Sequence, residues 1–362
     1  MYKIVQVIPA LGWGGAQVFC LQLCNQFASD PDYDVTLISM YDYKESAHLP
    51  KTRLHSRVKF ITLGKKKGWD YSLFFKMYKL IKKLQPHVVH THMHTSFYCL
   101  PAYILNRKNK YRKVHTLHSM ALIDNPSWYG RLAYKYFFWA KIIQPVCISE
   151  EGKKSAGKFY GKSIDTLIEN GSAPAVKTSL FESTATTLCR LKKDGHTKIL
   201  LNVARINKIK NQKLLLQVMQ TLQEKNINVV AVILGECVEQ DKHLYEELLK
   251  IKPGNTHFLG KVNNVSDYCL LTDAFCLTSL QEGLPISLLE AFSAGLIPVC
   301  TPAGELAHIV EKNTGFLSKD FAHDSYLQAV TDYLETCEHR VNELKSNCID
   351  LYKKKYSIQS CA

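Results

Sequence analysis

The feature that most restricts the fold of this chain is a repeated alternation of short apolar runs with longer amphipathic segments. A short apolar run bounded by turn residues is typical of a buried strand, whereas apolar residues spaced every three to four positions indicate a helix. The predicted strands of the first series are 3–8, 34–39, 58–63, 87–92, 113–118, 145–149 and 165–169. Such alternation builds a parallel sheet covered by helices on both faces, so we expect an α/β domain.

A second series of the same kind follows a polar stretch that is rich in Ser and Thr. Its predicted strands are 198–204, 228–234, 256–259, 274–279, 296–300 and 315–318. We therefore expect two doubly wound Rossmann-like domains, at 1–175 and 196–340, joined by a linker at 176–195. A helix at 341–362 can pack back on the first domain. Ligands of open α/β sheets bind beyond the carboxyl ends of the strands, so the expected site is an interdomain cleft.

Composition agrees with two globular domains. The chain has 362 residues, of which 46% are apolar and 22% are charged. Its 12 cysteines lack paired CxxC spacing, and the N-terminus lacks a basic segment followed by a long apolar run. We expect no disulfide framework, no signal peptide and a cytoplasmic location. No run approaches the roughly 18 apolar residues that span a bilayer, so membrane contact would be peripheral.

Positive charge is concentrated in the first half. Residues 1–180 contain 26 Lys and Arg against 11 Asp and Glu, whereas residues 181–362 contain 20 against 21. Much of the excess lies in two predicted helices, 70–84 and 128–143, where Lys and Arg alternate with aromatic residues. Such an asymmetry suggests that one domain faces something anionic, either nucleic acid or an acidic lipid surface such as the inner face of the plasma membrane. Core helices with a solvated outer face are an equally good interpretation of the pattern.

Glu282 and Glu290 bracket the predicted start of a helix that follows the strand at 274–279. Pro285 suits the first helical position, and Gly295 suits the position just past the end. Glu290 then lies about five residues into the helix, ~7 Å along it at 1.5 Å per residue. The free amides and the dipole at a helix start favour an anion, and carboxylates accept hydrogen bonds from hydroxyls. The run predicts a site for a sugar, a diphosphate and a ribose in a row. The alternative is an ordinary acid at a helix start beside a surface glutamate.

Two cations lie in the loop after the strand at 198–204. Arg205 and Lys210 precede a predicted helix at 211–223, where positive charge opposes the helix dipole. An anion in the loop would resolve this conflict, because Arg offers a fork of donors and Lys a point charge to phosphate oxygens. Lys208 is interpreted as a solvated surface lysine.

Two further candidates lie at strand ends of the first domain. Gly14 and Gly15 join the first strand to the first helix and allow the backbone to approach a phosphate or carboxylate, although a plain turn would have the same residues. His118 ends the strand at 113–118, where its side chain would face the cleft and could contact substrate hydroxyls.

Two possible metal motifs are interpreted otherwise. His90, His92 and His94 would share one face only if the strand continued past them, and no acidic or Cys partner lies nearby in the sequence. The Asp-x-Asp at Asp30 and Asp32 lies in a turn rich in Asp and Pro, away from strand carboxyl ends. The sequence therefore predicts no metal site.

Taken together, these residues resemble glycosyltransferase family 4, whose members are retaining enzymes of the GT-B fold, and the resemblance extends over nearly the entire chain. It rests on the Glu-x7-Glu pair with the Arg/Lys loop, and on Gly14-Gly15-Ala16-Gln17, the His118 strand, Asn170-Gly171, Asn211-Gln212, Leu259-Gly260-Lys261-Val262 and Glu282-Gly283-Leu284-Pro285. Ala204 and Gln17 differ from the residues frequent in the family, Gly and Glu. The chain also ends where relatives usually continue through a final helix.

The resemblance implies a role for each position. Arg205 and Lys210 would neutralise the donor diphosphate, with no metal and no other cofactor. Glu290 would bind the ribose, and Glu282 would hold the donor sugar. The remaining implied contacts are the Gly283 and Leu284 amides and Pro285 at the sugar, Gly14, Gly15 and Gln17 beside the phosphates and acceptor, His118 near the reacting carbon, and Lys261 and Val262 beside the base.

The implied function is transfer of a sugar, with retention, from a nucleotide-sugar, expected to be UDP-linked, to a lipid-linked glycan in bacterial surface-polysaccharide assembly. Two alternatives remain at this point. A related fold can act as a nucleotide-sugar epimerase or hydrolase, which product analysis would reveal. A non-enzymatic nucleic-acid binder would use the basic half, but the chain lacks a recognisable RNA or DNA module, so no nucleic-acid partner is expected.

Overall fold

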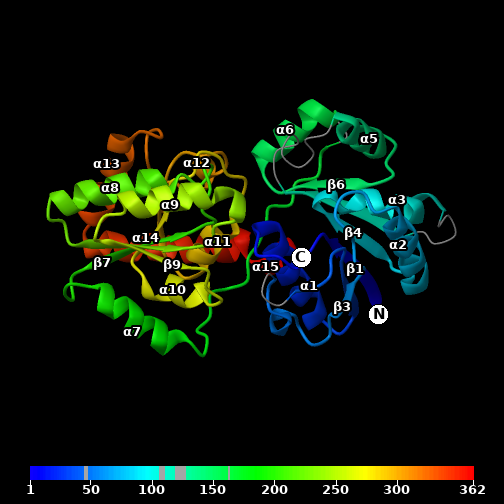
Figure 1. Ribbon diagram of the computed structural model, residues 1–362, viewed down its shortest axis with the longest axis horizontal. Coiled ribbons are helices and arrows are strands. Elements are labelled where there is room, and N and C mark those ends of the chain that lie inside the picture. Colours follow the sequence, from blue (N-terminus) through cyan, green and yellow to red (C-terminus); the bar gives the residue numbers. More distant parts are fainter. Residues whose placement is uncertain (45–47, 106–110, 119–127, 162–163) are drawn as a thin grey trace. The chain divides into compact units, whose positions relative to one another are not determined.

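The computed structural model describes residues 1–44, 48–105, 111–118, 128–161 and 164–362 (Figure 1). It divides into two compact units: the first contains Met1–Gly171 and Cys361–Ala362, and the second contains Ser172–Ser360. Each unit has a six-stranded sheet in which all recorded strand pairs are parallel. The α/β prediction is confirmed for both halves of the chain.

The first unit alternates strands and helices as the sequence predicts. Its elements are β1 (Tyr2–Ile8), α1 (Gly15–Ser29), β2 (Tyr33–Ser39), β3 (Lys59–Thr62), α2 (Tyr71–Leu84), β4 (Val88–His92), α3 (Ser96–Leu105), β5 (Arg112–Leu117), α5 (Trp128–Trp139), β6 (Gln144–Cys147) and α6 (Glu150–Tyr160), with short 3-10 turns η1 (Lys51–Arg53) and η2 (Met93–Thr95). The strand order is β3-β2-β1-β4-β5-β6. The chain therefore changes direction across the sheet between β1 and β4.

The second unit repeats this plan. Its elements are α7 (Phe181–Leu191), β7 (Lys198–Val203), α8 (Gln212–Glu224), β8 (Val229–Leu234), η3 (Glu239–Asp241), α9 (Lys242–Ile251), β9 (Thr256–Gly260), α10 (Val265–Leu271), β10 (Ala274–Leu277), α11 (Ile286–Ser293), β11 (Ile297–Cys300), α12 (Leu306–Ile309), β12 (Phe316–Leu317), α13 (His323–Leu334), α14 (Glu338–Leu351), the π-helical turn η4 (Tyr352–Tyr356) and α15 (Ile358–Cys361). The order β12-β11-β10-β7-β8-β9 places the same reversal between β7 and β10.

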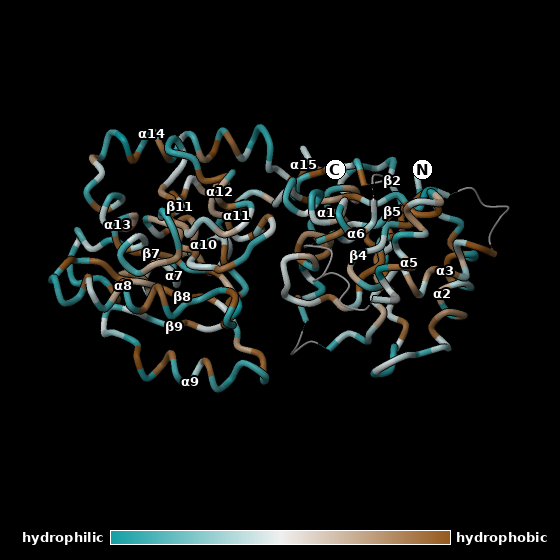
Figure 2. Tube along the Cα trace, turned by 90° about the horizontal axis from the view of Figure 1, so that it is seen from above, coloured by the Kyte–Doolittle hydropathy of each residue, from teal (hydrophilic) through white to brown (hydrophobic). Residues whose placement is uncertain are grey.

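Burial explains why the apolar runs form central strands. Every residue of β8, β10 and β11 is buried, which requires cover on both faces of the sheet. In the first unit, α2, α3, α5 and α6 pack in one apolar cluster, while α1 packs in another. Figure 2 shows apolar and polar residues alternating along α9 and α14, as expected for helices with one face on the core.

The segment 176–195, predicted to be a linker, is instead part of the second unit. It contains α7, and the backbone N–H and hydroxyl of Thr178 donate to the Asp267 carboxylate at 2.8 and 2.6 Å. The side chain of Asn264 donates to the Thr184 hydroxyl at 2.7 Å. The Ser- and Thr-rich composition that resembles a linker thus supplies hydrogen bonds that attach this segment to α10.

Two other predicted elements differ from the structure. The segment 165–169 forms one bridge, between Leu167 and Cys147 of β6, rather than a strand. The predicted helix at 341–362 is interrupted at Ser357, which bridges to Ser172 while α14 ends at Leu351. In both places the structure has an isolated backbone bridge to a distant segment where the sequence predicts a longer element.

Candidate functional site

The reversal point of the second sheet brings two predicted site residues into contact. Lys210 lies in the loop after β7, Glu282 lies in the loop after β10, and these two strands are neighbours. Nζ of Lys210 donates to Oε1 of Glu282 at 2.5 Å, and the Ser279 hydroxyl donates to the same oxygen at 2.6 Å. The Glu282 side chain is only 7% exposed and that of Lys210 is 21% exposed. The pair therefore lies at the carboxyl edge of the sheet, the side formed by the carboxyl ends of its strands, where ligands of doubly wound folds bind.

Backbone contacts hold the two loops together around this pair. Leu280 N–H donates to the Ile209 carbonyl at 2.8 Å, and the Thr278 hydroxyl donates to the Lys210 carbonyl at 3.2 Å. The Thr301 hydroxyl, after β11, donates to the Ser279 carbonyl at 2.6 Å. Three successive strand ends therefore fix the carboxylate and ammonium groups before any ligand arrives.

Arg205 lies at the start of the same loop with an exposed side chain. Its carbonyl accepts from Nε2 of the buried Gln212 at 3.0 Å, which joins the loop to the first residue of α8. Asn211 caps α8 in the left-handed region, with φ of 48°. The backbone thus turns sharply just after Lys210, and the Arg205 guanidinium stays available to solvent and to an anion.

The loop after β8 passes directly beside the Arg205 loop. Gly235 has φ of 154°, and a Cβ there would lie 1.9 Å from the Ala204 carbonyl oxygen. Glu236 follows, and its carboxylate is 3.2 Å from Nζ of Lys261, which follows β9. Lys261 and the half-buried Val262 therefore border this sheet edge, and their contact with a base stays a prediction.

The helix α11 begins one residue after Pro285, which the sequence predicts as the first helical position. Pro285 is its N-cap residue, without a side-chain cap, and Gly295 follows the helix with φ of 69°. Glu282 and Gly283 lie in the preceding loop with the buried Leu284. First-turn amides without a side-chain cap are donors for an anion beside Lys210.

Glu290 is the fifth residue of α11. Burial raises the pKa of Tyr352 to about 12, and the nearby Glu290 carboxylate adds to this shift. Burial also raises the pKa of the Cys269 thiol, and the same carboxylate raises it further. Glu290 therefore lies close to α10 and η4, and its contact with a ribose stays a prediction.

The reversal point of the first sheet carries an uncharged network. Nε2 of His92 and Oε1 of Gln6 are 2.8 Å apart, and Nδ1 of His92 and Nε2 of His118 are 2.9 Å apart. Gln6 and His92 are fully buried, and His118 is half-buried. His90 lies beside His92, with ring centroids 4.2 Å apart, and bonds to the Thr116 hydroxyl at 2.7 Å.

These imidazoles are neutral near pH 7. Burial lowers the pKa of His90 to about 4 and that of His118 to about 3, with proximity to His90 adding to the second shift. Burial also holds the pKa of His92 well below its usual value, and the neighbouring imidazoles lower it further. A neutral imidazole suits a hydroxyl group better than a phosphate.

The glycine loop lies at the same edge, after β1. Gly14 is the N-cap of α1, and Gly15 is its first residue. The Gln17 side chain folds back against Gly14. An uncharged amide therefore lies beside this loop, at a position where Glu is frequent in the family. Phe19 of α1 lies against His118, with ring centroids 6.0 Å apart. The predicted residues of the first unit therefore gather at one sheet edge.

The two motifs that resemble metal sites have other roles. β4 ends at His92, and Met93 has φ of 56°, so His94 does not continue the strand. Asp30 accepts the Asp32 N–H at 2.9 Å, which is the predicted turn. Within the described ranges, no group of three His, Cys, Asp or Glu side chains is arranged to hold a metal ion.

Comparison with known proteins gives a family for each half of the chain. A profile described as glycosyltransferase family 4 matches residues 13–171, and one described as glycosyl transferases group 1 matches residues 188–348. The first half of the chain therefore contains a glycosyltransferase family 4 domain, and the second half contains a glycosyl transferases group 1 domain. The chain is a glycosyltransferase of the GT-B fold, and the predicted fold and enzyme class are confirmed.

Relatives include two Escherichia coli enzymes. The chain is 27% identical over 295 residues to UDP-Gal:alpha-D-GlcNAc-diphosphoundecaprenol alpha-1,3-galactosyltransferase, covering 77% of this chain and 74% of the relative. It is 25% identical over 306 residues to the O-antigen biosynthesis glycosyltransferase WbnH, covering 83% and 81%. A Rickettsia africae glycosyltransferase has a TM-score of 0.80 at 14% identity, covering 99% of this chain and 95% of that one. Anabaena HepE with UDP and glucose has a TM-score of 0.77 at 15% identity, covering 100% and 97%.

Several residues of these sheet edges were missed from the sequence. Gln6 and Asn202 are fully buried polar residues within apolar strands, and this break in the pattern was the available signal. The Asn202 amide donates to the Cys276 carbonyl at 2.7 Å, joining β7 to β10, the two strands that precede the loops of Lys210 and Glu282. Gly235 gave no signal, because only the close approach of two loops identifies it.

Proposed function

We propose that this glycosyltransferase moves a sugar, with retention, from UDP to a hydroxyl of a lipid-diphosphate-linked glycan. The observation that carries the proposal is the contact between Lys210 and Glu282 at the reversal point of the second sheet. It places a cation that can bind phosphate in direct contact with a carboxylate that can bind sugar hydroxyls. Lys210 can exchange Glu282 for a phosphate oxygen when the donor binds, which frees the carboxylate for the sugar.

Charge on the leaving diphosphate is stabilised by protein groups in this proposal. Arg205 and Lys210 supply two positive charges, and the first turn of α11 supplies amide donors. Fixed donors of this kind stabilise charge that develops in a transition state without a metal. Attack then occurs on the face from which the diphosphate leaves, and a leaving phosphate oxygen accepts the hydroxyl proton.

The nucleotide and acceptor are inferred from the relatives. The 27% identical Escherichia coli enzyme is named for a UDP-galactose donor and a diphosphoundecaprenol-linked acceptor. We assign the same chemical classes to this chain, a UDP-sugar and a polyprenyl-diphosphate glycan. The ribose is assigned to Glu290 and the base to Lys261 and Val262.

A lipid-linked acceptor requires contact with a membrane surface. Within the part of the chain that the structure describes, no helix is long and apolar enough to cross a bilayer. The outer face of α5 instead exposes Trp128, Leu132, Tyr136 and Trp139, each by more than half. These residues recur every three to four positions, so they form one stripe along the helix.

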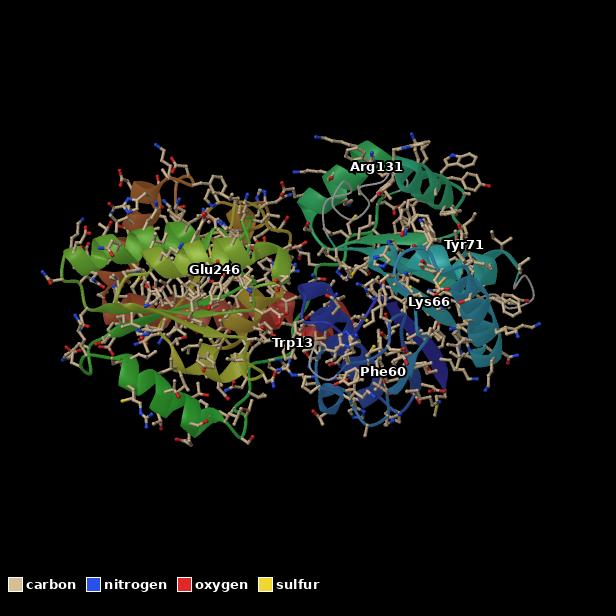
Figure 3. All side chains as sticks on the ribbon, in the orientation of Figure 1. Trp13, Phe60, Lys66, Tyr71, Arg131 and Glu246 are labelled. Atoms are coloured by element: carbon tan, nitrogen blue, oxygen red, sulfur yellow. The ribbon has the colours of Figure 1, made fainter. Side chains whose placement is uncertain are left out.

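The neighbouring helices extend this surface. Tyr71 and Phe75 of α2 are 79% and 59% exposed, and Tyr71 is labelled in Figure 3. The layer formed by α2, α3 and α5 packs in one apolar cluster of the first unit. The sequences of these three helices contain six Lys or Arg and no Asp or Glu. Trp and Tyr favour the headgroup region of a bilayer, and Lys and Arg are attracted to anionic lipids. We assign this layer to the inner face of the plasma membrane.

The test is a transfer assay with UDP-, GDP- and ADP-sugars and an undecaprenyl-diphosphate-linked GlcNAc acceptor. We expect acceptor-dependent release of UDP and an α-linked product from an α-linked donor, without added metal and in the presence of EDTA. An altered free sugar without transfer would instead show an epimerase or a hydrolase. Release of GDP or ADP, or a requirement for metal, would contradict the proposed donor chemistry.

A further inference from the structure

The uncharged network of the first unit lies on one face of its sheet. In the recorded register, Gln6 pairs with His90 and His92 pairs with Thr116, and paired residues of a parallel sheet point the same way. His118 lies two positions beyond Thr116, which places it on the same face. The face on which these residues lie is therefore polar at the point where the chain reverses its direction across the sheet.

Hydrogen-bond directions in this network are determined by one group. A neutral imidazole has one N–H and one lone pair, whereas Oε1 of Gln6 can only accept. His92 must then donate from Nε2 to Gln6 across 2.8 Å, which leaves its Nδ1 as an acceptor. His118 must donate from Nε2 to that nitrogen across 2.9 Å. Nδ1 of His118 is left as a lone pair.

Gln6 is poorly explained as a folding residue. It is fully buried, and its Nε2 has no hydrogen-bond partner among the described residues. An apolar side chain would avoid the cost of burying an unpaired amide. The side-chain carbonyl oxygen of Gln6 does form a hydrogen bond, and its partner is His92.

We propose that Gln6 is a positioning residue that, through His92, fixes the tautomer of His118 so that its Nδ1 accepts a hydrogen bond from a hydroxyl of the donor sugar. The inference rests on the proposed contact between His118 and that sugar. Without Gln6, His92 can carry its proton on either nitrogen. In the molecules where Nδ1 of His92 is protonated, Nε2 of His118 must accept that proton's hydrogen bond, and Nδ1 of His118 becomes a donor. A sugar hydroxyl would then lose a fixed partner.

The tautomer can be read directly in the free protein. A two-bond 1H–15N spectrum of 15N-histidine-labelled enzyme at pH 7 separates protonated from unprotonated ring nitrogens, and the His118→Gln variant assigns the His118 signals. We expect wild-type His118 to carry its proton on Nε2. We expect Gln6→Met, which keeps the side-chain length and removes the acceptor, to give a mixture of tautomers.

The matched control is Thr116→Val. It removes a 2.7 Å hydrogen bond to His90 on the same sheet face and leaves Gln6, His92 and His118 unchanged. We expect it to retain the wild-type tautomer and rate. For Gln6→Met we expect kcat/KM to fall about threefold to tenfold, the loss of one hydrogen bond, with UDP affinity unchanged.

The outcomes separate this inference from the proposed function. A proton on Nδ1 of wild-type His118 would overturn the inference even if Gln6→Met failed to fold. An unchanged tautomer in a folded Gln6→Met would also overturn it, as would a changed tautomer with a wild-type rate. The expected tautomers with no transfer by the wild-type enzyme would contradict the proposed function, but the effect of Gln6 on the His118 tautomer would still stand.

Discussion

The two sheets share one strand order but carry opposite chemistry at the point where that order reverses. In the second unit, the ion pair of Lys210 and Glu282 lies between neighbouring strand ends. In the first unit, the corresponding place holds the uncharged network of Gln6, His92 and His118. One topology therefore presents a charged edge and a neutral edge.

The presence of charged side chains at each edge does not follow the net charge of the corresponding half of the sequence. The first 180 residues carry the excess of Lys and Arg, yet their sheet edge is neutral, and the nearly balanced second half has the charged edge. Bulk charge acts over a surface, whereas a binding site depends on a few fixed groups. The comparison favours the second unit as the place where the diphosphate binds.

Loss of Lys210 should give the largest effect. Lys210→Ala removes a positive charge from the leaving diphosphate, and we expect kcat/KM to fall about 100- to 1000-fold, as for loss of one fixed donor at a developing anion. The measurement is acceptor-dependent UDP release. Lys208→Ala, in the same loop but exposed, is the control and should keep nearly full activity. Equal activity of the two variants would remove the charged edge from the mechanism.

Gly235→Ala tests how rigidly the second edge is built. A Cβ at Gly235 would meet the Ala204 carbonyl oxygen at 1.9 Å and would require φ of 154°, so one loop must move. We expect a loss of about 2–3 kcal/mol in stability and weaker UDP binding, measured by urea unfolding and calorimetry. Gly195→Ala is the control, because nothing lies within 4 Å of its new Cβ. A stable Gly235→Ala variant with normal UDP affinity would show that the close approach is unimportant.

The neutral edge predicts that the first unit loses stability in acid. The folded pKa values of His90 and His118 are about 4 and 3, below their usual 6.5. Between pH 6.5 and 4 the unfolded chain therefore binds more protons, and the free energy of unfolding falls as pH falls. Each such histidine contributes about 1.4 kcal/mol per pH unit in this window, with no further gain above pH 7.

Tryptophan fluorescence isolates this effect. All 4 tryptophans, at positions 13, 69, 128 and 139, lie in the first unit, so their emission during urea unfolding reports that unit. The control is the double variant His90→Gln/His118→Gln, which should show a shallower dependence on pH. Identical slopes for both proteins would mean that these imidazoles are not held neutral.

The smallest effect concerns the exposed layer on the first unit. Trp128→Ser with Trp139→Ser should weaken binding to vesicles containing anionic lipid about tenfold, because two interfacial aromatic side chains are lost. Co-sedimentation measures this binding, and UDP affinity is the internal control. Leu249→Ser, at an exposed position of α9 in the second unit, should leave vesicle binding unchanged. Equal binding by all variants would mean that α5 does not contact the membrane.

The sequence predicted most of the fold because each unit is built from local patterns. The start of α11 next to Pro285, its end before Gly295 and the loop position of Glu282 all follow from residue preferences at helix ends. Contacts between distant segments were not predictable in the same way. The meeting of Gly235 with Ala204, and of Gln6 with His92, depends on strand order, which periodicity does not specify.

The central claim is that Lys210, at the reversal point of the second sheet, binds the diphosphate of the donor, whereas the neutral histidines of the first sheet do not. The most direct test is calorimetric titration of UDP, which has the diphosphate but no sugar, into Lys210→Ala and His118→Gln. The account predicts that Lys210→Ala weakens UDP binding by at least about tenfold, the equivalent of ~1.4 kcal/mol, while His118→Gln binds UDP as the wild type does. Normal UDP binding by Lys210→Ala, together with its loss in His118→Gln, would contradict the account.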